Sequence, residues 1–152
     1  MAIKMKTSVT LSAKADCSSH SLAEVAVRDL VQMIDEPSER GGTNKGFTPT
    51  DTALSALIGC TNVIGHKCAA KLGVDIGNLK ISAKCRFNRL GVTLAEEIDV
   101  PFEEIDLVVV ADGAASDDEL QKVAQEVAKF CPLAKLFRGA GTIINEDWRK
   151  AE

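Results

Sequence analysis

The chain of 152 residues contains no tyrosine, one tryptophan (Trp148) and two histidines (His20 and His66). A metal site with three histidine ligands and a phenolic general acid are therefore both excluded. No segment approaches the roughly 18 consecutive apolar residues that a membrane-spanning helix needs. Residues 1–11 alternate between apolar and polar side chains and lack the apolar core of a signal peptide. These absences predict a soluble, cytoplasmic protein without a membrane partner.

The sequence also lacks any run of charges of one sign. Its 18 Lys and Arg residues stand against 22 Asp and Glu residues, which gives a net charge of −4 and a pI of about 5.3. Because proteins that bind nucleic acid normally carry a basic patch, we expect no nucleic-acid partner. The remaining composition, 45% hydrophobic and 26% charged, is typical of one globular domain that buries its own core.

The five cysteines, at positions 17, 60, 68, 85 and 131, are odd in number and form no C-x-x-C motif. This pattern is typical of reduced thiols and not of a disulfide framework. Cys60, His66 and Cys68 cannot share a zinc ion, because on one helix they point in divergent directions. We therefore expect no metal and no bound cofactor. If the protein is an enzyme, cysteine is its candidate nucleophile.

Hydrophobic periodicity predicts an α+β fold with a mostly antiparallel sheet. The clearest helix start has Thr48 as the cap, Pro49 in the first turn and Asp51 completing a capping box. The body of this helix is apolar around most of its circumference, which predicts burial by a sheet or by a second subunit. A long surface loop is expected at 35–47. The predicted strands cover 3–14, 23–34, 78–89, 92–100, 104–112 and 141–148, and the predicted helices cover 49–72, 117–130 and 132–139.

Two cysteines have contrasting local settings. Cys131 precedes Pro132 at a predicted helix start, where unpaired N–H groups and the helix dipole favour a thiolate; the alternative is a small buried cap residue. Cys60 lies in the middle of an apolar helix, where burial keeps a thiol neutral, so periodicity alone favours a structural role. Any activating group for Cys60 has to come from elsewhere in the fold. Cys68 and Cys85 are interpreted as small hydrophobic residues of the core, and Cys17 as a residue of a polar turn with no group nearby that would activate it.

Two segments of the chain together resemble one protein family. The first, GTNKGFTPTDTALSALIGC, holds a Thr43-Asn44 loop, the helix-opening Pro49 and Cys60 three turns later. The second, KFCPLAKLFRGAGTIINEDW, places Cys131-Pro132 between a helix and a short helix with a last strand. These features resemble the OsmC/Ohr family of osmotically inducible and organic-hydroperoxide-resistance proteins. The resemblance implies one OsmC-like domain over 1–152, in which mostly antiparallel sheets wrap around the long central helices of an intertwined homodimer.

The resemblance also implies a thiol-dependent peroxidase that reduces organic hydroperoxides or hydrogen peroxide. In peroxidase members, the cysteine that matches Cys60 attacks the peroxide bond as a thiolate and becomes a sulfenic acid. The cysteine that matches Cys131 then closes a disulfide, and an external dithiol reductant resets the enzyme. The implied roles are therefore peroxidatic for Cys60 and resolving for Cys131, with a cation that holds Cys60 ionised.

The sequence departs from the family pattern at the position after Pro49. Peroxidase members have a glutamate there, which orients an arginine from an N-terminal segment onto the reactive sulfur, whereas this chain has Thr50. Asp51 follows one position later, about 100° further round the helix. We expect Asp51 and Arg28 to take the corresponding roles, with Arg40 as the other candidate arginine.

Two further interpretations follow from this departure and from the residue inventory. The first is a non-catalytic OsmC-like protein that binds a small apolar ligand or senses redox state at the dimer interface. The second is cysteine-based hydrolysis or acyl transfer, which ranks last because neither histidine is placed beside a candidate nucleophile.

Overall fold

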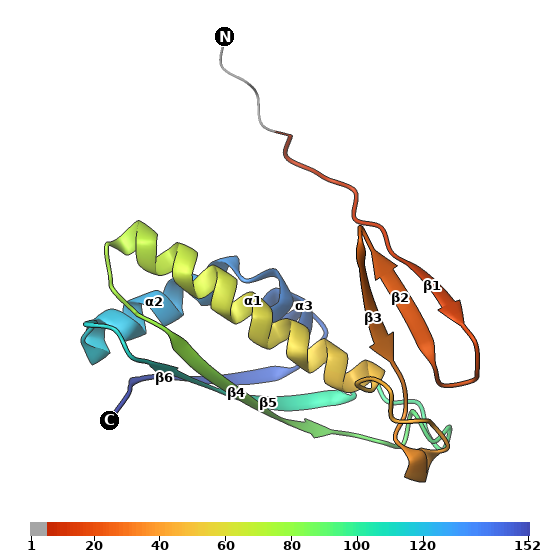
Figure 1. The fold of residues 1–152 in the computed structure, drawn as a ribbon. Helices are drawn as coiled ribbons and strands as arrows, with labels where there is room; N and C mark the ends of the chain where they lie inside the picture. Colours follow the sequence, from red (N-terminus) through yellow and green to blue (C-terminus); the bar gives the residue numbers. More distant parts are fainter. Residues whose placement is uncertain (1–5) are drawn as a thin grey trace. The chain divides into compact units, whose positions relative to one another are not determined.

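A computed structural model describes residues 6–152 and divides the chain into two compact units, one extending to Ala53 and the other spanning Leu54–Glu152. Within the described residues, each unit contains one three-stranded sheet, and three α-helices are present (Figure 1). The α+β fold class is confirmed. No helix within the described residues is long and apolar enough to cross a membrane.

The first unit is built on an antiparallel sheet of β1 (Lys14–Cys17), β2 (Ala23–Val27) and β3 (Leu30–Ile34), in that order. The prediction of a single strand at 23–34 is wrong, because a two-residue turn divides this segment into β2 and β3. Arg28 adopts a left-handed φ of 57° in this turn, and Val27 pairs with Leu30 across it. The alternation of the sequence continues through so short a turn and conceals it.

The strand predicted at 3–14 is also misplaced. Residues 6–13 have no regular secondary structure, and the first strand begins only at Lys14; residues 3–5 lie outside the described part of the chain. Lys14 pairs with Ala26, and β2 ends one residue further on, so the preceding segment finds no partner along β2. A strand pattern without a partner strand does not produce a strand.

A loop at 35–47 contains the short 3₁₀ helix η1 (Ser38–Arg40) and is closed by a parallel bridge between Ile34 and Phe47. It leads into α1 (Pro49–Leu72), whose predicted bounds are confirmed. The predicted cap is present, since the Thr48 hydroxyl accepts a hydrogen bond of 3.1 Å from the Asp51 N–H. This satisfies one of the free donors at the start of the helix.

The second unit has a mixed sheet of β4 (Leu79–Phe87), β5 (Phe102–Ala111) and β6 (Ile143–Lys150). Strands β4 and β5 are antiparallel, and β5 and β6 are parallel. The body of α1 lies on one face of this sheet with α2 (Asp117–Phe130) and α3 (Pro132–Gly139) (Figure 1). The largest fully buried apolar side chains of the core are Leu57, Ile105, Leu107, Val109, Leu120, Val123, Val127 and Trp148.

The strand predicted at 92–100 is wrong. The segment forms consecutive turns, with hydrogen bonds from the Leu94 N–H to the Gly91 carbonyl and from the Ala95 N–H to the Leu90 carbonyl. Leu94 has a φ of 59° and is 93% exposed. The segment connects β4 to β5, and these two strands pair directly with each other. Its backbone groups therefore bond locally in place of a sheet ladder.

Helix α1 is buried along one face only. Its buried residues are Leu57, Thr61, Gly65, Cys68 and Ala69, whereas Val63 is 51% exposed. The contact at Gly65 is close, since a β-carbon there would lie 3.0 Å from Cη2 of Trp148. The expectation that this helix is buried by a sheet or by a second subunit is thus met by the sheet on one face, and burial by a second subunit stays a prediction.

Candidate active site

The sulfur atoms of Cys60 and Cys131 meet in the second unit. Cys60 lies in α1 and Cys131 at the joint between α2 and α3, 71 residues later, and the Cys131 thiol donates a hydrogen bond of 3.3 Å to Cys60 Sγ. Both are free thiols. The structure thus brings together the two cysteines that the sequence analysis singled out.

Cys131 ends α2 and caps α3. Its N–H bonds to the Val127 carbonyl, and its sulfur accepts a hydrogen bond of 3.5 Å from the Ala134 N–H. Its side chain is completely buried. Burial raises the pKa of the Cys131 thiol from 9.0 to about 11; the Ala134 bond opposes this shift and the neighbouring Cys60 adds to it. The helix-terminus effect that favours a thiolate is therefore present, but burial outweighs it.

Cys60 is more accessible than Cys131. It is half-buried, and it follows Gly59, where a β-carbon would meet no atom within 4 Å. The next residue, Thr61, is buried and returns its hydroxyl to the Leu57 carbonyl at 2.8 Å, so it presents no free polar group. A small molecule from solution therefore reaches Cys60 before Cys131.

A network of hydrogen bonds joins α3 to β6. Arg138 forms an ion pair with Glu146, with 3.0 Å between Nη2 and Oε1, and Trp148 donates its indole N–H to the other oxygen of Glu146 at 3.2 Å. Among the described residues, Nη1 of Arg138 is buried without a hydrogen-bond partner. This network was not predicted from the sequence, where its only local signal is an inward-facing glutamate in an alternating strand.

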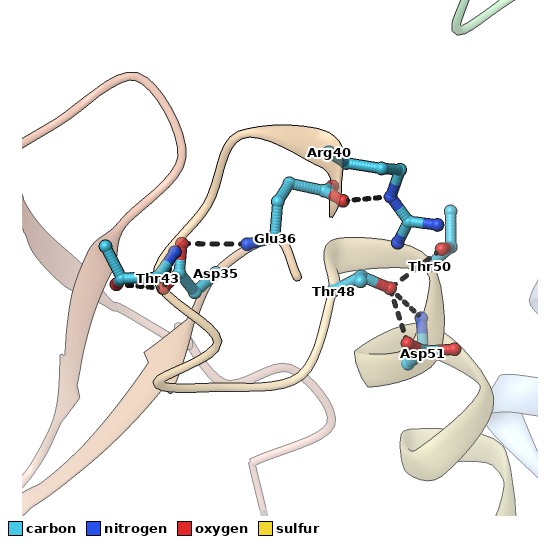
Figure 2. Close-up of polar contacts among 7 residues, drawn as sticks. All are labelled: Asp35, Glu36, Arg40, Thr43, Thr48, Thr50 and Asp51. Carbon is cyan, nitrogen blue, oxygen red and sulfur yellow. Dashed lines mark hydrogen bonds and ion pairs between the residues drawn. The ribbon is translucent and has the colours of Figure 1, made fainter. Parts of the chain in front are cut away.

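The loop before α1 is organised around Asp35, in the first unit (Figure 2). This carboxylate is completely buried and accepts hydrogen bonds from the Thr43 hydroxyl at 2.5 Å and from the N–H groups of Glu36, Thr43 and Lys45. The Thr43 hydroxyl, followed by the Lys45 and Glu36 N–H bonds, holds the pKa of Asp35 far below its ordinary value, although burial acts in the opposite direction. The loop expected at 35–47 thus has a defined internal anchor.

Two other polar groups lie near the end of this loop. Arg40 forms an ion pair of 2.6 Å with Glu36, and the Thr48 hydroxyl contacts both Thr50 at 3.0 Å and the Asp51 carboxylate at 2.7 Å (Figure 2). Asp51 therefore takes part in the helix cap. The partner of Arg40 is Glu36, a residue that the sequence analysis did not consider.

The tentative site residues Arg28 and Asp51 belong to the first unit, and Cys60 and Cys131 belong to the second. Arg28 occupies the β2–β3 turn. The involvement of Arg28 or Asp51 at Cys60 stays a prediction.

Two of the remaining cysteines, Cys68 and Cys85, have the surroundings of structural thiols. Burial, with a smaller contribution from Glu126, raises the pKa of Cys68, and burial raises the pKa of Cys85 on β4. Cys17 is exposed at the end of β1. Within residues 6–152, no group of three or more His, Cys, Asp or Glu side chains is placed to hold a metal ion.

Comparisons of the sequence with family models and of the structure with solved structures both find OsmC-like proteins. The family model described as OsmC-like protein matches residues 42–146. An OsmC-like protein from Mycoplasma pneumoniae has a similar structure, with a TM-score of 0.78 and 20% identity over 95% of this chain and 99% of that one. An organic hydroperoxide resistance protein from Elizabethkingia anophelis, with thiocyanate bound, gives a TM-score of 0.71 and 17% identity over 97% and 100% of the two chains. No curated protein sequence matches the chain.

Proposed function

Because the chain belongs to the OsmC-like protein family, we propose that it is a thiol-dependent peroxidase that reduces organic hydroperoxides or hydrogen peroxide in a two-cysteine cycle. The 3.3 Å between the sulfur atoms of Cys60 and Cys131 carries this proposal. A disulfide bond is about 2.05 Å long, so only a small approach separates the two thiols from a bond. The names of similar structures, organic hydroperoxide resistance proteins, support the substrate class.

The two cysteines take different roles because their exposure differs. Cys60 is half-buried and Cys131 is completely buried, so the peroxide meets Cys60 first. The Cys60 thiolate attacks the terminal peroxide oxygen, the O–O bond breaks, and the alcohol or water leaves with a proton. The product is a sulfenic acid at Cys60.

The second step forms the disulfide. The Cys131 sulfur attacks the sulfenic sulfur of Cys60, and the hydroxyl leaves as water with the Cys131 proton. An external dithiol then supplies two electrons and two protons by thiol–disulfide exchange, which restores both thiols and leaves the dithiol oxidised. No bound cofactor takes part in this cycle.

The first step requires a cation that favours the Cys60 thiolate in its partly apolar surroundings. We assign this role to Arg28, with Asp51 as its acidic partner, and Arg40 is the competing candidate. The charge of Arg40 is already engaged by Glu36, which favours Arg28. Replacing Arg28 with glutamine should slow peroxide attack on Cys60. Replacing Arg40 with glutamine should slow the same step less.

The exposed face of α1 supports a homodimer as the working form. Val63 is 51% exposed on the face of α1 that is not buried. The body of this helix is too apolar for a surface position. A second copy of the chain would cover this face. Sedimentation equilibrium tests this: a dimer is expected, and a monomer at all concentrations would contradict it.

The reaction can be followed by stopped-flow mixing of the reduced protein with cumene hydroperoxide or hydrogen peroxide, and by mass mapping of the cysteines. We expect rapid formation of a Cys60–Cys131 disulfide and steady turnover with dithiothreitol. Cys60→Ser should abolish turnover, and Cys131→Ser should accumulate a sulfenic or over-oxidised Cys60. Cys85→Ser, which removes a half-buried thiol elsewhere in the second unit, is the matched control.

The same experiment tests the alternative function. Thr50 holds its hydroxyl against Thr48 at the position where peroxidase members carry an acidic residue, and this favours a protein that binds an apolar ligand or senses redox state. Slow and indiscriminate oxidation of several cysteines would support that alternative. Turnover by both serine variants at the parent rate would show that the two-cysteine assignment is wrong.

A further inference from the structure

Resting on the proposed function, we propose that Arg138 and Glu146 are positioning residues for its second step: their ion pair fixes α3 so that the Cys131 thiol faces Cys60. The Arg138 side chain is 35% exposed and the Glu146 side chain 11%. This is the least exposed of the ion pairs in the described part of the chain. An ion pair shielded from water holds its geometry better than one at the surface.

The position of the Glu146 carboxylate is held by its hydrogen bond with the buried Trp148. One of its oxygens accepts the indole N–H of Trp148, which is 1% exposed and packs against Gly65 of α1. The Trp148 carbonyl in turn accepts a hydrogen bond of 2.9 Å from the Gln121 side chain of α2. The carboxylate that receives Arg138 is therefore tied to the sheet and to both longer helices.

The two ends of α3 have different constraints: the first end can rotate at Cys131, and the second is held by Arg138. Its first end is Cys131, the single extended residue between α2 and α3, with φ −69° and ψ 111°. Rotation about the bonds of one such residue would swing α3 and redirect the attached thiol. At the other end, Arg138 is the penultimate residue of α3, and its ion pair with Glu146 opposes that swing.

Arg138 depends on Glu146 for its charge balance. Its Nη1 atom is buried and makes no hydrogen bond to any described residue, and its Nη2 atom pairs with Glu146. Neutralising Glu146 would leave a partly buried cation uncompensated, and α3 would shift to expose it. Glu146→Gln is therefore the closest variant in shape: it removes the charge and replaces one of the two acceptor oxygens, which face Arg138 and Trp148, by an N–H₂ group.

The expected effect separates the two steps of the cycle. Peroxide attack at Cys60 should keep the parent rate. The following step, in which the Cys131 sulfur displaces the hydroxyl from Cys60 as water and the disulfide forms, should slow about tenfold to a hundredfold, as expected for a misplaced reacting group. Sulfenic acid should therefore accumulate at Cys60, although both cysteines are present.

The test uses single-turnover mixing with cumene hydroperoxide, followed by dimedone trapping and mass mapping of Cys60. Arg138→Met and Glu146→Gln are compared with Arg86→Met, which removes an exposed arginine paired with Glu103 and Glu104 on the same sheet. Slow disulfide formation in the first two variants, with a normal first step and a normal control, supports the proposal. The double variant should be no slower than the worse single variant, because both changes remove the same interaction.

Three results decide against the proposal or separate it from the proposed function. Disulfide formation at the parent rate in both variants would overturn it. Equal slowing of both steps with a lower Tm would show a merely structural role and overturn it as well. If Arg138→Met does not fold, Arg138→Lys keeps a charge near Glu146 and should show an intermediate rate. A parent protein that does not react with peroxide would instead refute the proposed function.

Discussion

Asp35 and Cys131 are both completely buried, one in each unit, yet their environments change their pKa values in opposite directions. The pKa of Asp35 lies far below its ordinary value, chiefly because the Thr43 hydroxyl and then the Lys45 and Glu36 N–H groups donate to the carboxylate. The pKa of Cys131 is raised to about 11 by burial, and the 3.5 Å bond from Ala134 compensates only part of this.

The difference shows that burial alone does not decide protonation. A buried group stays charged when enough donors replace the water that it lost, and becomes neutral when they do not. Asp35 is therefore an anion at neutral pH, and it organises the loop before α1. Cys131 is a buried thiol that is largely neutral at pH 7.

The largest expected effect concerns the pH dependence of disulfide formation. Because the pKa of Cys131 is about 11, its thiolate fraction should rise with pH. The step should accelerate about tenfold per pH unit, or about a hundredfold between pH 7 and 9. Single-turnover mixing with a saturating peroxide at each pH measures this. A flat profile would show that disulfide formation does not require prior loss of the Cys131 proton, so that the raised pKa of Cys131 does not limit the step.

The next effect concerns the stability of the loop around Asp35. Asp35→Asn places an amide N–H₂ against donors that need an acceptor, and should lower Tm at pH 7 by about 5 °C or more. Because the pKa of Asp35 is lowered in the folded state, its contribution is complete above the ordinary value of 3.8 and declines as pH falls further. The difference between parent and variant should therefore narrow in acid.

Thermal melts followed by circular dichroism at pH 7 and pH 3 measure this difference, with Asp16→Asn as the control for an exposed aspartate on β1. A loss of stability that stays the same at both pH values would mean that the charge of Asp35 is not what holds the loop.

The smallest expected effect concerns how much each hydrogen-bond donor to Asp35 contributes to the stability of the loop. Thr43→Val removes the hydroxyl donor but leaves the N–H groups of Glu36, Thr43 and Lys45 on Asp35. Tm should fall by only about 2 °C, since the carboxylate stays ionised. The same melting experiment applies. A fall as large as that of Asp35→Asn would show that the stability of the loop depends on the Thr43 hydroxyl and not on the N–H groups.

The helices were predictable because their signals are local. The bounds of α2 and α3 agree with the prediction: Pro132 opens α3 directly after Cys131, and the structure adds a capping box between Ser116 and Glu119 at the start of α2. These signals depend on residues within four positions of each other. The same locality explains the correct cap at Thr48.

The strands were less predictable because a strand needs a partner. Residues 92–100 alternate as a strand does, but β4 and β5 pair with each other and leave the segment in turns. The chain also reverses at Arg28, in the middle of a continuous alternation. Alternation reports which side chains face inward and says nothing about which backbone is available for pairing.

For the candidate site, the sequence by itself determined the cysteines, the helix positions that carry them and the family to which the chain belongs. Only the tertiary structure decided that Cys60 and Cys131, 71 residues apart, lie 3.3 Å from each other, and that Cys131 is buried enough to be a neutral thiol. It also decided that Glu146 forms an ion pair with Arg138 and that Asp35 is buried among hydrogen-bond donors. Capping and periodicity act over a few neighbouring residues, whereas desolvation and contact depend on what the whole fold packs around a group.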